Sequence, residues 1–304
     1  MTMPTLLDIA KRNGSDQVVG LIDEASRVHP ELTLIPARTI RGLNYKTFVR
    51  TANPTVAFRS ANEGTPATKG TYENRLVETF IMNPRWECDK AVADRSEDGA
   101  PAYIALEAEA MTEAAMQTLC TQLYYGTGAD AKGFPGLVAA YDATNMVVDA
   151  GGTTGATGSS VWALRFGPKN VIWVWGNGGS LELSPVTEQR ILDGSSNPFT
   201  AYIQELLAYP GLQVASLLSI ARVKKITADS GHTLTDGMIA ALLALFPAGT
   251  RPDVLLMNRR SIGQLQNSRT ATNATGAPAP FPGESFGIPI AVTDAILSTE
   301  ALTL

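Results

Sequence analysis

The stretch with the clearest potential for chemistry is the glycine-rich segment 124–137, YYGTGADAKGFPGL. It places Lys132 among the glycines Gly126, Gly128 and Gly133, and such a combination can bind the phosphates of a nucleotide. A phosphate-binding loop follows a strand and opens a helix, because it uses the free N–H groups at the helix N-terminus. The Walker sequence would also place Lys-Ser or Lys-Thr directly after its last glycine. Phe-Pro follows instead.

The residues before this segment decide how it is interpreted. Residues 101–125 repeat apolar side chains at helical spacing, with Pro101 at a favourable first position and Gly126 at the C-terminal end. The apolar face consists of Ile104, Ala108, Met111, Ala115, Leu119 and Leu123. Since the glycines follow a helix, we interpret them as a helix stop and a turn. An α/β enzyme with a ligand loop at 124–137 is the alternative.

Histidine and cysteine are the other residues that could support catalysis or metal binding. The two histidines, His29 and His232, lie far apart and beside turn signals, which is typical of surface loops. No G-x-S-x-G supplies a nucleophilic serine, and no H-E-x-x-H supplies a zinc site. Cys88 and Cys120 stand alone, and Cys120 falls on the apolar side of the predicted helix, as a small core residue would. We therefore expect no catalytic, cofactor or metal site, and no enzyme.

The composition limits the partners of the chain. It has 304 residues, of which 44% are hydrophobic and only 17% charged, and its net charge is −5. The longest apolar run, 238–246, is far too short to cross a bilayer, so we expect no membrane partner. No concentrated basic face favours tight binding to nucleic acid. Low charge together with 27 glycines and 18 prolines indicates that much of the surface is loop or is covered by other subunits.

The N-terminal part of the chain is poor in residues that could form a core. Residues 1–40 predict an arm that docks on something else. Residues 41–64 hold two β-rich runs around Ala-Asn-Pro and predict a projecting hairpin. A lone two-stranded ribbon cannot bury its own apolar residues, so we expect them to contact a neighbouring subunit. The expected subunit-contact residues are Tyr45, Phe48, Val49, Val56, Phe58 and Arg59.

The second half of the chain predicts alternating strands and helices. Strands are expected at 161–167, 170–176, within 212–227, at 253–258 and at 288–296, and helices from Thr235 and at 259–266. Such a mixture, with one long helix ahead of it, indicates the α+β class.

The order of these elements resembles that of the major capsid proteins of tailed bacteriophages. It is most similar to the coat proteins of epsilon15-like short-tailed phages, which share the HK97 fold. The similar stretches follow one another along the whole chain: Thr5–Ala10, 49–64, the helix end with GFPGL, 159–168, 221–227, 252–261 and 287–301.

The resemblance implies an HK97-like α+β fold with four parts. These are an N-terminal arm at 1–40, an E-loop at 41–80, a peripheral domain at 81–130 with its spine helix at 101–125, and further peripheral strands with an axial domain at 131–304. An encapsulin-like nanocompartment shell would share this fold and is a second alternative.

The resemblance also implies a function. A protein of this family self-assembles in pentamers and hexamers into an icosahedral shell, which encloses a double-stranded DNA genome without sequence-specific binding. Its location is the virion, after assembly in the bacterial host cytoplasm. Scaffolding, portal and cement proteins are candidate partners, and no cofactor is implied.

Overall fold

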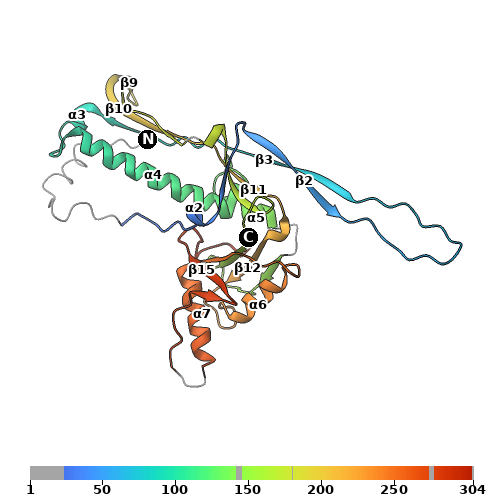
Figure 1. Ribbon diagram of the computed structural model, residues 1–304. Coiled ribbons are helices and arrows are strands. Elements are labelled where there is room, and N and C mark those ends of the chain that lie inside the picture. Colours follow the sequence, from blue (N-terminus) through green and yellow to red (C-terminus); the bar gives the residue numbers. More distant parts are fainter. Residues whose placement is uncertain (1–23, 142–145, 180, 274–276, 303–304) are drawn as a thin grey trace.

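The computed structural model describes residues 24–141, 146–179, 181–273 and 277–302 as a mixed fold of helices and sheets (Figure 1). The helices are α2 (Glu31–Leu34), α3 (Lys90–Ala93), α4 (Gly99–Tyr125), α5 (Leu137–Tyr141), α6 (Asp236–Ala244) and α7 (Arg259–Ala271). The strands are β1 (Ala37–Thr39), β2 (Asn44–Ala52), β3 (Thr71–Glu78), β4 (Arg85–Asp89), β5 (Val147–Asp149), β6 (Ser159–Leu164), β7 (Val171–Trp175), β8 (Glu182–Leu183), β9 (Thr187–Leu192), β10 (Pro198–Leu207), β11 (Pro210–Val214), β12 (Ile220–Ile226), β13 (Val254–Met257), β14 (Glu284–Ser285) and β15 (Ile288–Val292).

Helix α4 confirms the predicted long helix and begins two residues earlier than expected. Its 27 residues span about 40 Å. Met111, Ala115, Leu119 and Leu123 are buried, as their spacing predicted. Ile104 and Ala108 are only half-buried, which corrects the expected face at its N-terminal end. Tyr103 is buried there instead, because this end of the helix packs beside Cys88 and Ala93.

A six-stranded sheet in the order β14-β15-β13-β6-β12-β5 lies at the centre of the fold. Alternate residues of β6 face two different clusters. Trp162 and Leu164 pack with the end of α4, whereas Val161 and Ala163 pack with α6 and α7. Because both faces are covered, this sheet holds the two halves of the hydrophobic core together.

A second sheet runs along α4 (Figure 1), with the order β4-β10-β8 and with β9 also paired to β10. Met111 and Ala115 of α4 pack against Leu206 of β10 in a small separate cluster. The apolar face of this helix is therefore covered by a sheet at Met111 and Ala115. Among the residues that the structure describes, no helix is both long and apolar enough to cross a membrane.

The predicted arm at 1–40 falls partly outside the described residues. Its described part docks on the subunit's own core, since β1 pairs in parallel with β7 and Ile35 is 2% exposed. A short parallel pairing of this kind leaves no local sequence signal, because the partner strand lies far along the chain.

Strands β2 and β3 form a two-stranded antiparallel ribbon that projects from the rest of the molecule (Figure 1). Their register runs from Asn44 opposite Glu78 to Ala52 opposite Thr71. This corrects the hairpin predicted within 41–64, since the run after Ala-Asn-Pro is not a strand. Pro54, directly before that run, lacks an N–H group for a strand ladder. Residues 53–70 form a long connection instead.

The alternating helices and strands predicted for the C-terminal part are confirmed. A side chain caps the N-terminus of each of the two helices, α6 and α7. The hydroxyl of Thr235 accepts a hydrogen bond from the Met238 N–H at 3.3 Å, and Asn258 Oδ1 accepts one from the Ser261 N–H at 2.9 Å. Such caps satisfy the free N–H groups of a first turn, which makes helix starts readable from sequence.

Replacing Met111 by Asp should destabilise the subunit by about 3–5 kcal/mol, because an unpaired carboxylate would replace a side chain that packs on Leu206. Soluble yield and thermal unfolding measure the effect. Ala105→Asp is the matched control, since Ala105 is exposed on the same helix. Equal stability of the two variants would show that the buried face of α4 is assigned wrongly.

Candidate functional site

The glycine-rich segment closes the C-terminal end of α4. Gly126 has a φ of 54°, and a Cβ atom there would lie 2.1 Å from the backbone nitrogen of Gly136. The two ends of the segment therefore cross at a distance that only glycine permits. The buried Gln122 holds the segment from within, donating to the carbonyl oxygens of Asp130 at 3.1 Å and Phe134 at 2.8 Å.

This geometry does not match a phosphate-binding loop. The segment follows α4, and the helix after it, α5, has only five residues. Phe134 is buried with its ring edge on Trp173, and Lys132 is exposed to solvent. A cavity of about 160 Å³ beside the segment is lined chiefly by apolar residues such as Phe80 and Leu119. The glycines therefore act as the predicted helix stop.

The β2–β3 ribbon carries apolar side chains that the described parts of its own chain leave exposed. Phe48 on β2 and Tyr72 on β3 stack with their ring centroids 5.0 Å apart, and both are exposed. In the connection between the strands, Val56 is 88% exposed and Phe58 is fully exposed. An isolated patch of this kind marks an interaction surface.

The six predicted contact residues fall into two groups. Phe48, Val56, Phe58 and Arg59 are exposed on the ribbon or its connection, whereas Tyr45 and Val49 are half-buried on the other face of β2. The Tyr45 hydroxyl donates to Gln213 of β11, and the guanidinium of Arg38 lies 5.0 Å from the centre of the Tyr45 ring. Tyr45 thus anchors the base of the ribbon to its own subunit. The role of the other residues stays a prediction.

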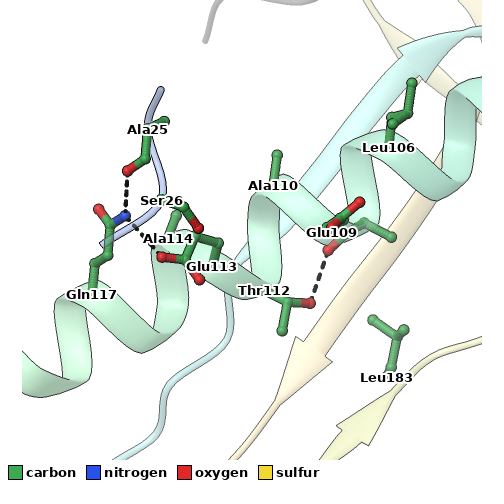
Figure 2. A pocket seen from close by; sticks show the side chains of 11 residues that line it. Ala25, Ser26, Leu106, Glu109, Ala110, Thr112, Glu113, Ala114, Gln117 and Leu183 are labelled. Atoms are coloured by element: carbon green, nitrogen blue, oxygen red, sulfur yellow. Dashed lines mark hydrogen bonds between the residues drawn. The ribbon is translucent and has the colours of Figure 1, made fainter. Parts of the chain in front are cut away.

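A groove of about 500 Å³ runs along the outer side of α4 (Figure 2). Figure 2 shows its floor of small side chains, including Ala110 and Ala114, with Leu183 of β8 on the far side. The Gln117 amide donates to the Ala25 carbonyl at 2.9 Å, and Glu113 Oε1 accepts the Arg27 N–H at 3.1 Å. That backbone N–H, with help from Gln117, lowers the pKa of the Glu113 carboxyl.

One of the two histidines lies differently from the sequence-based expectation. His232 is tied to the Ala150 carbonyl oxygen through Nδ1 at 2.7 Å, but the His29 side chain is only 9% exposed. The prediction of a surface histidine was therefore wrong for His29. It packs near Glu31 and Cys120, and burial together with Glu31 raises the pKa of the Cys120 thiol. The position of Cys120 in the core is confirmed.

The family comparison and the structural comparison indicate the same class of protein. The model of the major capsid protein GP7 family matches residues 12–303. No curated protein matches the chain. Among solved structures, a chain of bacteriophage Epsilon15 is similar with a TM-score of 0.75 and 22% identity, covering 99% of this chain and 98% of that one. The bacteriophage JBD30 capsid is similar with a TM-score of 0.53 and 9% identity, covering 97% of this chain and 99% of that one.

These structural similarities confirm the predicted α+β class and the HK97-like fold. They extend along nearly the whole chain, so the fold assignment does not depend on one region. The projecting ribbon and the long helix belong to the matched part.

Replacing Gly126 by Ala should lower the free energy of unfolding by about 2 kcal/mol or more, because the left-handed backbone and the crossing with Gly136 both exclude a side chain. Gly128→Ala is the matched control, since no atom lies within 4 Å of its Cβ position. Thermal unfolding measures both variants. If Gly126→Ala were as stable as Gly128→Ala, the segment would not be a close-packed helix stop.

Proposed function

The chain belongs to the major capsid protein GP7 family, and from this premise we propose that its copies form the pentamers and hexamers of an icosahedral shell around a double-stranded DNA genome. Shell formation and a place in the virion follow from the family itself. The family favours a phage capsid over an encapsulin-like compartment and over an enzyme.

The observation that carries the proposal is the exposed apolar ribbon. Its two strands pair only with each other, and a lone two-stranded ribbon is marginally stable in water. Burying one side chain of the size of Phe58 in a neighbour contributes about 1.5–3 kcal/mol. A shell repeats each contact many times, so modest energies at single residues suffice for a stable assembly.

The proposal gives each part of the fold a place in the shell. The ribbon with its connection is the E-loop, within 41–80, and α4 is the spine helix of the peripheral domain at 81–130. The six-stranded sheet with α6 and α7 belongs to the axial domain within 131–304. The N-terminal arm at 1–40 and the groove along α4 are further contact surfaces between subunits.

The proposed partners follow from charge and family. A net charge of −5 suits a shell that encloses DNA without binding it tightly, since tight binding needs a concentrated basic face. Scaffolding, portal and cement proteins are proposed as partners during and after assembly in the bacterial host cytoplasm. We propose no membrane partner, and no cofactor that shell formation requires.

A structural role predicts that the chain has no catalytic activity. Purified protein should hydrolyse ATP no faster than buffer alone, and Lys132→Ala should change nothing, because the glycine-rich segment is a helix stop. Lys169→Ala is the control, as an exposed lysine away from that segment. A saturable rate that Lys132→Ala abolishes and Lys169→Ala keeps would establish a ligand loop.

Replacing Phe58 by Ser should weaken assembly while leaving the subunit folded, because the side chain is fully exposed among the described residues of its own chain. Losing about 1.5–3 kcal/mol at each contact corresponds to a contact roughly ten- to hundredfold weaker. Negative-stain microscopy and size-exclusion chromatography measure the shells, and circular dichroism measures the fold.

Ala57→Ser is the matched control, because it places a serine in the same exposed connection. A second variant replaces 55–68 by a short Gly-Ser connection and keeps β2 and β3 paired. Shells of normal stability from both the Phe58 and the shortened variants would refute the contact assignment. Loss of the circular dichroism signal would place the connection in the subunit's own core.

A further inference from the structure

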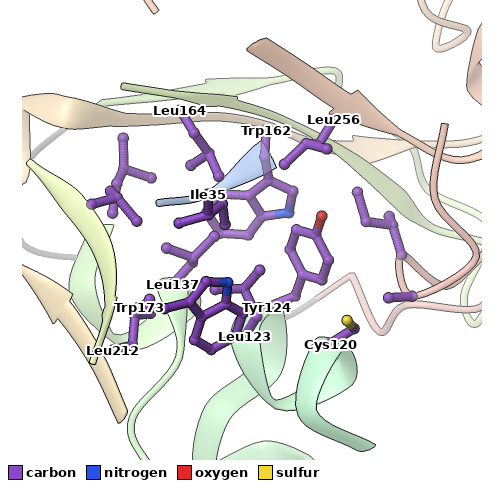
Figure 3. Packing of buried hydrophobic residues seen from close by; sticks show 14 of the residues in the cluster. Ile35, Cys120, Leu123, Tyr124, Leu137, Trp162, Leu164, Trp173, Leu212 and Leu256 are labelled. Carbon is purple, nitrogen blue, oxygen red and sulfur yellow. The ribbon is translucent and has the colours of Figure 1, made fainter. Parts of the chain in front are cut away.

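Three potential metal ligands from two segments of the chain meet at α4. His29, Glu31 of α2 and Cys120 of α4 each place one ligand atom within 4.8 Å of the others. Within the described ranges no other such group of histidine, cysteine and acidic side chains occurs. Figure 3 shows the Cys120 sulfur at the border of the core cluster, one turn before Tyr124 on the same helix.

The members of this cluster are buried and incompletely partnered. Glu31 is 0% exposed. Its Oε1 accepts a hydrogen bond from the Tyr124 hydroxyl at 2.6 Å, but its Oε2 has no partner. Both ring nitrogens of His29 are buried without a well-formed hydrogen bond. Cys120 is completely buried as well. Native structures rarely leave several buried polar atoms unsatisfied in one place.

The charges of the cluster favour the binding of a cation. A buried carboxylate is costly unless a positive charge or several hydrogen bonds compensate it. No lysine or arginine of the described residues forms an ion pair with Glu31. A second carboxylate lies close by, because Glu113 Oε1 is 3.4 Å from His29 Nε2. Only the His29 ring could supply positive charge among these four side chains.

We propose that His29, Glu31 and Cys120 form a binding site for a divalent transition-metal ion, with zinc as the best match. Imidazole nitrogen, carboxylate oxygen and thiolate sulfur are the three ligand types of protein zinc sites. Tetrahedral ligands around zinc lie about 3.3–3.8 Å apart. The present spacing of up to 4.8 Å therefore requires only small side-chain movements.

The surroundings suit such a site. The carboxylate of Glu113, next to His29, or a water molecule completes the fourth position. The Tyr124 hydroxyl orients Glu31 through its hydrogen bond to Oε1, which is how outer residues commonly fix a ligand. A bound ion would clamp the segment before β1 onto the middle of α4, replacing unsatisfied polar atoms by coordination bonds. This goes beyond the proposed shell function and does not depend on it.

Metal analysis of the folded full chain tests the site. Protein stripped with a chelator and then dialysed against Zn²⁺ should retain about one ion per chain, and its melting temperature should rise with zinc concentration. Loading with Co²⁺ should produce the near-ultraviolet charge-transfer band of a thiolate ligand. Cys120→Ser should abolish that band, and Cys88→Ser should keep it, because the buried Cys88 lies in another cluster.

His29→Gln gives a second variant that leaves both buried cysteines in place, and it should lose zinc retention. Wild-type protein that retains no zinc and shows no thiolate band would refute the site, and the cluster would then be a hydrogen-bonded contact only. A thiolate band that survives Cys120→Ser would refute it too. Zinc retention and the thiolate band of the wild-type protein are enough to refute the site, so a variant that fails to fold does not prevent the test. Shell assembly is scored separately, so either proposal can fail without the other.

Discussion

The structure depends most on a buried ion pair between Arg222 and Glu300. The two side chains are 1% and 3% exposed, with Nη2 and Oε2 at 3.0 Å. Ser160 also contacts both of them, and the guanidinium lies 5.0 Å from the centre of a Trp162 ring. The Tyr125 hydroxyl donates to the other carboxylate oxygen at 2.7 Å. Removing one partner of such a pair typically costs about 3–5 kcal/mol, so the end of α4, the central sheet and the C-terminal segment stay together.

This junction fits the proposal that the ribbon contacts other subunits. The central sheet is covered on both faces, and the end of α4 is closed by crossing glycines, so neither of these two described surfaces offers the ribbon an apolar face to cover. Its base is fixed by Tyr45 on Gln213 and by Arg75, which donates to the Ala215 carbonyl at 3.1 Å. Beyond that base, side chains such as Phe48 and Phe58 are exposed and do not belong to the hydrophobic core of their own subunit. A rigid body with a projecting apolar ribbon suits repeated contacts between identical copies.

Local patterns predicted the elements well and their long-range pairing poorly. Helix periodicity located α4, and local patterns located the helix from Thr235 and the helix at 259–266, because these signals act within one or two turns. The partner of β2 was missed, since β3 pairs with it across the long connection 53–70, and turn signals identify only strands that are joined by a short turn. The burial of His29 was missed for the same reason. Its surroundings are supplied by α4, and the contact of Glu31 with Tyr124 spans 93 positions.

The segment that holds the proposed metal site also shapes the groove along α4. Ala25 and Ser26 line one side of the groove. Hydrogen bonds from Gln117 to Ala25 and from Arg27 to Glu113 hold this wall, and His29 lies two residues after Arg27. A clamp at His29 would therefore fix the wall, because only a few residues of extended chain separate the two. If a neighbouring subunit fills the groove as proposed, a wall held in advance would lower the entropy lost on contact, and preorganisation of this kind strengthens a contact without adding area. Through this short stretch of chain, chemistry inside the subunit can influence how firmly subunits hold one another.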